Sequence, residues 1–301
     1  MSIMQRILNP WLRAVEKRRM KTGTPAQLRR ALAGQSRMFF HAPRGTVYAQ
    51  ETYDDVPCQA VTPRGASEER VLFYIHGGAF VFGSPSTHSA MVASLAQRIG
   101  ARGVMPKYRL APEAPFPAAP DDVRAAWEGL LRSGVTPESI VVGGDSAGGA
   151  LAFGLVASLR AEGAPMPGAV FGFSPLTDLT HSGESFRTNA EADVVLPAES
   201  ADKLGALFLR GASPETPSVS PLFGDFEGAP PAWITVGDTE VLLDDGRRLA
   251  EKLRSQGVDT TLQVERDLPH VWPIFHNVLP EGRQTLDALA QWIRQRQNWV
   301  V

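Results

Sequence analysis

A serine between glycines is the residue whose surroundings most clearly predict chemistry. Residues 144–148 read Gly-Asp-Ser-Ala-Gly and lie between an apolar run at 140–142 and a helical pattern at 147–162. A serine on a sharp turn between strand and helix exposes its hydroxyl at the helix N-terminus, where backbone N–H groups face developing negative charge. The segment therefore predicts that Ser146 is the nucleophile of an acyl-transfer reaction.

A second glycine-rich turn lies 70 residues earlier (146 − 76). Its sequence at 76–79 is His-Gly-Gly-Ala, directly after the apolar run 71–75. Backbone N–H groups without bulky side chains can approach a substrate closely, so this turn is predicted to stabilise the oxyanion of a tetrahedral intermediate. The alternative is a plain strand-to-helix turn. His76 is expected to hold the turn through hydrogen bonds instead of acting as a base.

The base is expected late in the chain, because a nucleophile of this type is followed first by an acid and then by a histidine. Among the six histidines, His270 fits, since it follows the apolar run 260–264, and His276 is the reserve. The task of His270 is to take the Ser146 proton and return it to the leaving alcohol. The acids that are able to orient its imidazole follow the run 233–236 and are Asp238, Glu240, Asp244 and Asp245.

Alternating strands and helices are needed to position these residues. Past residue 45, short β-rich runs alternate with longer helical patterns, which is typical of a parallel sheet wrapped by helices. The strand-like runs are 71–75, 140–142, 169–173, 233–236 and 260–264. The helical patterns are 87–100, 120–133, 147–162, 243–256 and 281–297.

Two segments fall outside this alternation and are predicted to form a cap over the carboxyl ends of the strands. Residues 1–45 are expected to form short helices, with Asn9-Pro10 and Thr24-Pro25 each serving as an N-cap followed by proline at the first helical position. Residues 176–230 are too long for an ordinary connection and contain a helical stretch near 198–209. The catalytic domain is expected to span 46–301, with the second cap segment inserted into it.

Composition is typical of a globular protein. Of 301 residues, 43% are hydrophobic and the net charge is −2, so no general positive field attracts nucleic acid. The single cysteine, Cys58, excludes an internal disulfide and a cysteine-based zinc site and fits a reducing cytosol. No run approaches the ~20 apolar residues of a membrane span, so a soluble, cytoplasmic protein is expected. The arginine-rich stretch 5–30 leaves a transit peptide as an alternative, although serine is scarce there.

Four motifs stand in a recognisable order along the chain. They are the segments 76–79, 108–113 (Tyr-Arg-Leu-Ala-Pro-Glu) and 144–149, and the late segments that hold the acid and the histidine. Together they resemble the hormone-sensitive-lipase family of α/β-hydrolases, in particular the bacterial esterases of its GDSAG branch. The resemblance implies a mostly parallel eight-stranded sheet with helices on both faces, a helical cap, no cofactor or metal, and hydrolysis of short-chain carboxylic esters.

The resemblance also implies the oxyanion donors. They would be the backbone N–H groups of Gly78 and Ala79, next to Gly77 in the same turn, and of Ala147 after the nucleophile. Ala79 departs from the family's usual His-Gly-Gly-Gly. The donor survives that change, but the methyl group is expected to narrow the pocket.

The family position of the acid implies Glu240, 30 residues before His270 (270 − 240), although the family more often has aspartate there. Asp238 remains the alternative acid. Asp244 is expected to cap or balance the following helix.

Residues near these positions are candidates for the substrate pocket, although the apolar ones are equally able to form the core of the cap. The first set is Asp145, Phe40, Val195, Leu207, Val271 and Trp272, of which Asp145 is also able to position the turn. The wider set adds Met38, Phe39, Val194, Leu196 and Phe208. Arg109 is expected to brace its turn through an ion pair.

The sequence thus predicts a serine carboxylesterase with a Ser-His-Glu triad and an acyl-enzyme intermediate. A lactone hydrolase or deacetylase with the same triad is the alternative, and a non-catalytic small-molecule receptor is a third. The expected partner is a small-molecule ester, with no nucleic acid and no stable membrane association. A homodimer stays open.

Overall fold

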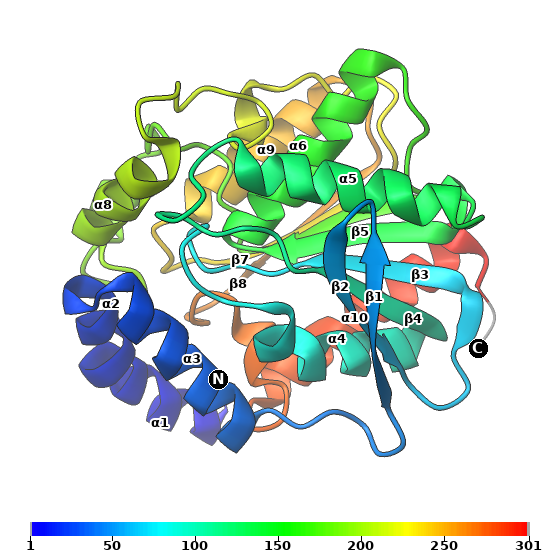
Figure 1. Ribbon diagram of the computed structural model, residues 1–301. Coiled ribbons are helices and arrows are strands. Elements are labelled where there is room, and N and C mark those ends of the chain that lie inside the picture. Colours follow the sequence, from blue (N-terminus) through cyan, green and yellow to red (C-terminus); the bar gives the residue numbers. More distant parts are fainter. Residues whose placement is uncertain (1, 300–301) are drawn as a thin grey trace.

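The computed structural model describes residues 2–299, with one sheet at the centre (Figure 1). Its eight strands lie in the order β1-β2-β4-β3-β5-β6-β7-β8. β2 pairs antiparallel with β1 and with β4, and the other neighbouring pairs are parallel. The expected mostly parallel eight-stranded sheet is confirmed. The strands are β1 Val47–Tyr53, β2 Val56–Thr62, β3 Ser67–Ile75, β4 Ala101–Pro106, β5 Ile140–Asp145, β6 Ala169–Phe173, β7 Ala232–Gly237 and β8 Thr260–Glu265.

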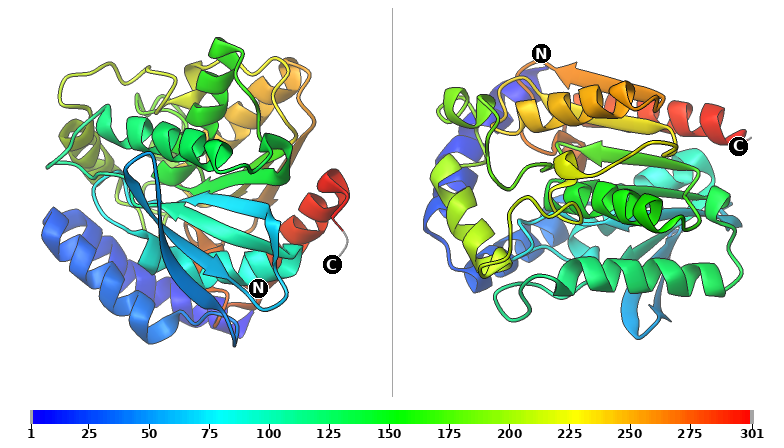
Figure 2. Two further views of the ribbon diagram at one scale, coloured as in Figure 1. Left: turned by 45° about the vertical axis from the view of Figure 1, so that its right-hand side comes forward. Right: turned by 90° about the horizontal axis from the view of Figure 1, so that it is seen from above.

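Long helices cover both faces of the sheet (Figure 2). One face carries α5 Ala118–Arg132, α6 Ala147–Glu162 and α9 Leu243–Ser255, and the other carries α4 Pro85–Ile99 and α10 Pro280–Gln297. Alternate residues of β3 divide between the two cores: Phe73 packs with α5 and α6, whereas Leu72 and Tyr74 pack with α4 and α10. This burial on both faces explains why residues 71–75, the second half of β3, form a continuous apolar run.

The five strand-like runs and the five helical patterns of the sequence are confirmed, but β1, β2 and β4 are absent from that prediction. β1 is an edge strand whose side chains are mostly exposed, so it has no apolar pattern. In β4, Arg102 and Gly103 interrupt the apolar residues. A Cβ at Gly103 would lie 2.7 Å from side-chain atoms of Val61 and Val92, so close packing requires glycine there.

The N-terminal segment departs from the expected short helices. A helix runs from Ile3 to Thr22 without a break, as α1 Ile3–Trp11, the π-helical η1 Leu12–Lys17 and α2 Arg18–Thr22. Pro10 lies inside α1, so the predicted N-cap at Asn9 is wrong. The helix begins after Ser2 instead, whose Oγ accepts a hydrogen bond from the Gln5 N–H at 3.2 Å.

The second predicted cap residue of this segment is confirmed. The side chain of Thr24 accepts a hydrogen bond from the Gln27 N–H and its own N–H is bonded by the Gln27 side chain, with Pro25 in the first helical position. Helix α3 Pro25–Phe39 follows and lies beside α1 and α2 (Figure 1).

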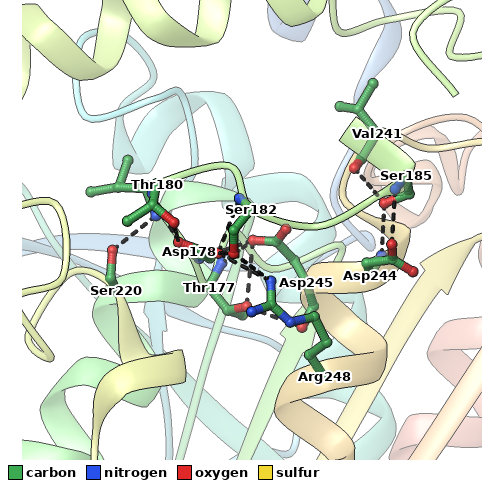
Figure 3. A network of polar contacts seen from close by, with 11 residues as sticks. Thr177, Asp178, Thr180, Ser182, Ser185, Ser220, Val241, Asp244, Asp245 and Arg248 are labelled. Carbon is green, nitrogen blue, oxygen red and sulfur yellow. Dashed lines mark hydrogen bonds and ion pairs between the residues drawn. The ribbon is translucent and has the colours of Figure 1, made fainter. Parts of the chain in front are cut away.

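The segment 176–230 contains α7 Ser185–Thr188, α8 Ala198–Leu209 and the 3₁₀ turn η3 Pro221–Phe223. Helix α8 has the predicted bounds and packs against α2 (Figure 1). A buried polar network fixes the start of the segment to α9 (Figure 3). In it, the Asp245 carboxylate accepts the backbone N–H groups of Thr177 and Asp178 at 2.6 and 3.0 Å. Two further 3₁₀ turns, η2 Pro137–Ser139 and η4 Trp272–Phe275, lie elsewhere in the chain.

Candidate active site

Ser146 occupies the strained turn that the sequence predicts, between the end of β5 and the start of α6. Its φ and ψ are 51° and −121°, a conformation that residues with a side chain rarely adopt. The nearby glycines allow close backbone packing. A Cβ added at Gly144 would lie 2.3 Å from the Gly148 carbonyl oxygen, and one added at Gly148 would lie 2.1 Å from the Ile75 carbonyl oxygen. The turn therefore has no room for a side chain two residues before or two residues after the serine.

His270 and Glu240 come together from the loops after β8 and β7. His270 Nδ1 lies 2.6 Å from Glu240 Oε2, and both residues are buried. The other oxygen, Oε1, accepts the Ser174 hydroxyl at 2.7 Å and the Gly237 N–H at 2.6 Å. Because both oxygens are engaged, the carboxylate has one orientation and holds the imidazole by Nδ1.

The other ring nitrogen of His270 is available for proton transfer. His270 Nε2 is buried and has no hydrogen-bond partner within residues 2–299, and it shares a cavity with Ser146. The structure shows no hydrogen bond between His270 Nε2 and the Ser146 hydroxyl, and such catalytic hydrogen bonds commonly tighten when substrate binds. Burial lowers the pKa of His270, but the hydrogen bond and charge of Glu240 outweigh it, so the pKa lies above its ordinary value of 6.5.

The rival residues lie elsewhere. Asp238 Oδ1 accepts the Asp267 N–H at 2.7 Å, and Asp244 accepts the Ser185 N–H at 2.8 Å in the first turn of α9. His276 is buried away from the cavity, and burial lowers its pKa to about 4. Of the candidate acids and bases, the structure brings together Glu240 and His270.

Gly78 and Ala79, in the glycine-rich loop after β3, line the large cavity, and neither backbone N–H donates a hydrogen bond within residues 2–299. Ala147 N–H, at the start of α6, likewise has no acceptor in the part of the chain described. Gly77, in the same turn, belongs to the oxyanion loop but is not a donor, because its N–H donates to Asp145 Oδ1 at 3.0 Å. A Cβ at Gly77 would lie 2.2 Å from Asp145 Oδ2, so this glycine permits close packing of the loop. Ala79 adopts a φ of 52°, which glycine favours.

Buried polar contacts fix this loop from behind. Asp145 Oδ1 accepts the Tyr74 hydroxyl at 2.7 Å, and Oδ2 lies 3.4 Å from His88 Nε2. His76 stacks on Tyr108 with ring centroids 4.3 Å apart, and Tyr108 donates to the His76 carbonyl. Burial lowers the pKa of His76 to about 3, so the ring stays neutral and positions the loop, as expected.

Arg109, in the turn after β4, has the structural part expected of it. Its guanidinium lies 2.7 Å from Asp122 of α5, and its backbone N–H binds the same carboxylate. The pair braces the turn, and neither residue lines the cavities that Ser146 lines.

Two cavities meet at Ser146. The large cavity has a volume of about 390 Å³ and mostly apolar walls, and it includes Ser146 and His270. The small cavity has about 60 Å³ and includes Ser146 but not His270. Ala79 lines both cavities, as do Met20 and Leu196.

The predicted pocket residues divide between the cavity and the core. Those that line the large cavity are Phe39, Phe40, Asp145, Val195, Leu196 and Val271. The prediction that Leu207 lines the pocket is wrong, because this residue is 38% exposed on α8 and lines neither cavity. The same prediction for Trp272 is also wrong, because this residue is fully buried and its Nε1–H donates a hydrogen bond to the Thr285 hydroxyl at 2.8 Å.

Three residues of the wider set also lie outside both cavities. Met38 is exposed, Val194 is buried beneath α1, and Phe208 stacks on Phe80 with ring centroids 3.9 Å apart. The direction of each side chain depends on how its helix or loop rotates against its neighbours, which periodicity alone does not give.

The sequence analysis missed one wall of the large cavity. The first helix lines it with Met4, Leu8, Trp11, Leu12, Glu16 and Met20, and α3 adds Leu32 and Gln35. The regular spacing of four among Met4, Leu8, Leu12 and Met20 is the signal that would have revealed this wall.

Within residues 2–299, no group of three or more histidine, cysteine, aspartate or glutamate side chains is placed to hold a metal ion. A search of the same residues for a helix long and apolar enough to cross a membrane gave none.

Known proteins provide an independent comparison. Residues 72–274 match the alpha/beta hydrolase fold family. The chain is 37% identical over 238 residues to an acetyl-hydrolase of Streptomyces hygroscopicus, covering 79% of this chain and 80% of that one. It is 36% identical over 227 residues to an esterase of Acinetobacter venetianus, covering 75% of each.

Solved structures agree over nearly the whole chain. An esterase from the bacterial hormone-sensitive lipase (HSL) family superposes with a TM-score of 0.93 at 36% identity, covering 99% of both chains. The crystal structure of EstE5 soaked with p-nitrophenyl butyrate gives a TM-score of 0.93 at 34% identity, covering 99% of this chain and 100% of that one.

Proposed function

The chain belongs to the alpha/beta hydrolase fold family and is an esterase of the bacterial hormone-sensitive-lipase group, and we propose that it hydrolyses short-chain carboxylic esters by acyl transfer to Ser146. The observation that carries the proposal is the 2.6 Å contact of His270 with Glu240 at the cavity that Ser146 lines. It leaves His270 Nε2 without a hydrogen-bond partner among the residues described, in the same cavity as Ser146 on its strained turn.

In the first half-reaction, Ser146 Oγ attacks the ester carbonyl carbon while His270 Nε2 takes the hydroxyl proton. The carbonyl π electrons move to oxygen, and the N–H groups of Gly78, Ala79 and Ala147 stabilise that oxyanion. When the tetrahedral intermediate collapses, the C–O bond to the alcohol breaks, and His270 protonates the leaving oxygen.

In the second half-reaction, water attacks the acyl-enzyme and His270 takes a proton from it. The new tetrahedral intermediate releases the carboxylic acid, and Ser146 Oγ regains its proton. Throughout, Glu240 accepts Nδ1–H, which fixes the tautomer and stabilises the imidazolium that forms.

The small cavity supports the short-chain preference. Its volume of about 60 Å³ has room for about four to six water-sized groups, which suits acyl groups from acetyl to about butanoyl. The name of the Streptomyces hygroscopicus relative, an acetyl-hydrolase, agrees with a small acyl group.

We assign residues 1–45 and about 176–230 to a cap on a catalytic domain of residues 46–301. The two segments bind each other: Lys17 Nζ donates to the carbonyl oxygens of Ala190 and Asp193 at 2.6 and 2.7 Å. Both segments also contribute walls to the large cavity, which supports a joint role in enclosing substrate.

Mass spectrometry of the acylated enzyme tests the proposal. Mixing the wild type with p-nitrophenyl butanoate at low pH and quenching within a turnover should give one butanoyl adduct, located on Ser146 by peptide mapping. Ser146→Ala should lose the adduct and lower kcat by about 10⁶, because triad members act as a unit.

The matched control is Ser133→Ala, at an exposed hydroxyl after α5. It should keep wild-type activity and the adduct. Turnover near wild type in Ser146→Ala, or an adduct on another residue, would contradict the proposal.

A further inference from the structure

Two polar side chains interrupt the apolar wall that the cap contributes to the large cavity. They are Glu16 of η1 and Gln35 of α3, which lie among methionine, leucine and aromatic side chains. Glu16 has only 17% of its side chain exposed. A carboxylate in such surroundings destabilises the fold unless it is bonded, so its presence calls for a partner.

Hydrogen bonds within the described chain engage only one of the two carboxylate oxygens of Glu16, and they leave the amide oxygen of Gln35 unbonded. Glu16 Oε1 accepts both the Arg19 guanidinium, at 2.5 Å, and the Gln35 amide N–H. Within residues 2–299, no group donates to Glu16 Oε2 or to Gln35 Oε1. Two acceptor oxygens therefore remain at the cavity, which suits a ligand that donates hydrogen bonds.

The irregular backbone of the first helix is what turns Glu16 toward the cavity. Residues 4, 8, 12, 16 and 20 line it. In an α-helix each step of four residues advances by about 40°, so four steps would carry the last side chain about 160° round the helix. The wider π-helical turn of η1 Leu12–Lys17 reverses this drift and keeps Glu16 on the cavity side.

The position of His270 decides which part of a substrate reaches Glu16. His270 protonates the leaving oxygen, so the alcohol part of the ester must lie on its side of Ser146. His270 lines the large cavity together with Glu16 and does not line the small cavity. The alcohol part therefore extends into the large cavity, and the acyl group into the small one.

We propose that Glu16 and Gln35 recognise a hydroxyl group on the alcohol part of the substrate, so that the preferred substrates are short-chain esters of alcohols that carry a second hydroxyl. This inference rests on the proposed esterase function. The apolar wall between the two ends accommodates the carbon chain that links ester and hydroxyl.

Three matched butanoate esters test it: hexyl, 6-hydroxyhexyl and 6-methoxyhexyl butanoate. The methoxy ester is polar but donates no hydrogen bond, so the hydroxy-to-methoxy ratio of kcat/KM isolates donation. We expect a ratio of about ten or more in the wild type, since bonds to charged groups are among the stronger ones. In Glu16→Leu the ratio should fall to near one, mainly through KM, and Glu16→Gln should keep most of it.

Because each ratio is measured within one protein sample, a partly unfolded variant does not change it. Arg18→Leu, on the exposed side of the same helix, is the matched control and should keep all three rates. A wild-type ratio of one or less, or an unchanged ratio in Glu16→Leu, would overturn the inference while hydrolysis of hexyl butanoate upholds the esterase function. If the wild type hydrolyses none of the esters, the proposed function itself fails.

Discussion

His270 Nδ1 lies 2.6 Å from Glu240 Oε2, although the two residues follow different strands and stand 30 positions apart. Ser174 and Gly237 hold the second oxygen of that carboxylate, so the longer glutamate side chain is fixed from behind. The neighbouring Asp238 is engaged with the backbone of Asp267. The arrangement gives each acid in the loop a separate part, and each can be tested.

Replacement of Glu240 by glutamine should lower kcat by about 10³ to 10⁴. The Gly237 N–H and Ser174 hydroxyl both donate to Oε1, so the amide oxygen is retained there and the NH₂ group faces His270 Nδ1. An NH₂ donor at this point favours the wrong imidazole tautomer. Steady-state kinetics on p-nitrophenyl butanoate measures the loss.

Asp238→Asn is the matched control, because the asparagine oxygen can still accept the Asp267 N–H. Its kcat should stay within a few-fold of the wild type. A severe loss in Asp238→Asn alone would assign the acid to Asp238 instead.

The pH dependence of kcat/KM should report His270. The imidazole must be neutral to accept the serine proton, so activity rises as pH increases through its pKa. Burial works to lower that pKa, but the Glu240 bond and charge raise it above 6.5. The acid limb of the profile should therefore have its midpoint above 6.5, and in Glu240→Gln, which lacks the charge, it should move to lower pH. A wild-type midpoint at or below 6.5 would contradict the assignment.

Local sequence signals predicted the parts of the site that local backbone geometry creates. The glycines around Ser146 specify the turn through local backbone sterics, without help from distant contacts. The acid and the histidine could be ordered along the chain because each follows its own strand. The Thr24-Pro25 cap was likewise predictable, since both its hydrogen bonds involve Gln27, three residues away.

Long-range contacts decided what the sequence failed to predict. The N-cap of the first helix, Ser2, is held by Glu281, 279 residues away, which accepts hydrogen bonds from the Ser2 backbone and hydroxyl. Trp272 enters the core because Thr285 of α10 accepts its N–H. Neither partner is marked by any pattern near the residue it fixes.

Ala79→Gly should broaden the acyl preference. Ala79 lines both cavities, so removal of its methyl group enlarges the space beside Ser146, and glycine adopts its φ of 52° without strain. The rate on p-nitrophenyl hexanoate relative to acetate should rise several-fold. An unchanged ratio would show that other walls of the small cavity set the acyl length.

Arg29→Met should weaken the link between cap and oxyanion loop. Arg29 of α3 donates to the Val81 and Ala111 carbonyl oxygens, each at 2.8 Å, and pairs with Glu113. Losing these bonds should lower the free energy of unfolding by about 1 to 3 kcal/mol and reduce kcat/KM several-fold, since Val81 follows the donors Gly78 and Ala79. Urea denaturation and kinetics measure both, with exposed Arg30→Met as control. Wild-type values in Arg29→Met would show that the link is dispensable.

The buried carboxyl of Asp245 should make stability fall as pH rises toward neutrality (Figure 3). Burial raises the pKa of Asp245 from 3.8 to about 7. The charge of Asp178 also raises this pKa, whereas the hydrogen bonds from the Thr177 and Asp178 backbones lower it. The folded protein thus keeps a proton between about pH 4 and 7 that the unfolded chain releases, so the free energy of unfolding decreases across that window.

Asp245→Asn should remove this dependence. The amide is neutral at every pH, and its oxygen can still accept the Thr177 and Asp178 N–H groups. Relative to the wild type, the variant should gain about 1 to 3 kcal/mol of unfolding free energy between pH 5 and 7.5, because each pKa unit corresponds to about 1.4 kcal/mol. Urea denaturation at several pH values measures the gain, and Asp244→Asn, in the same helical turn, is the control. A constant difference in unfolding free energy between Asp245→Asn and the wild type over this range would mean that Asp245 is already ionised in the folded protein. Arg248, which pairs with Asp178 at 3.1 Å, would then compensate the charges of both Asp178 and Asp245.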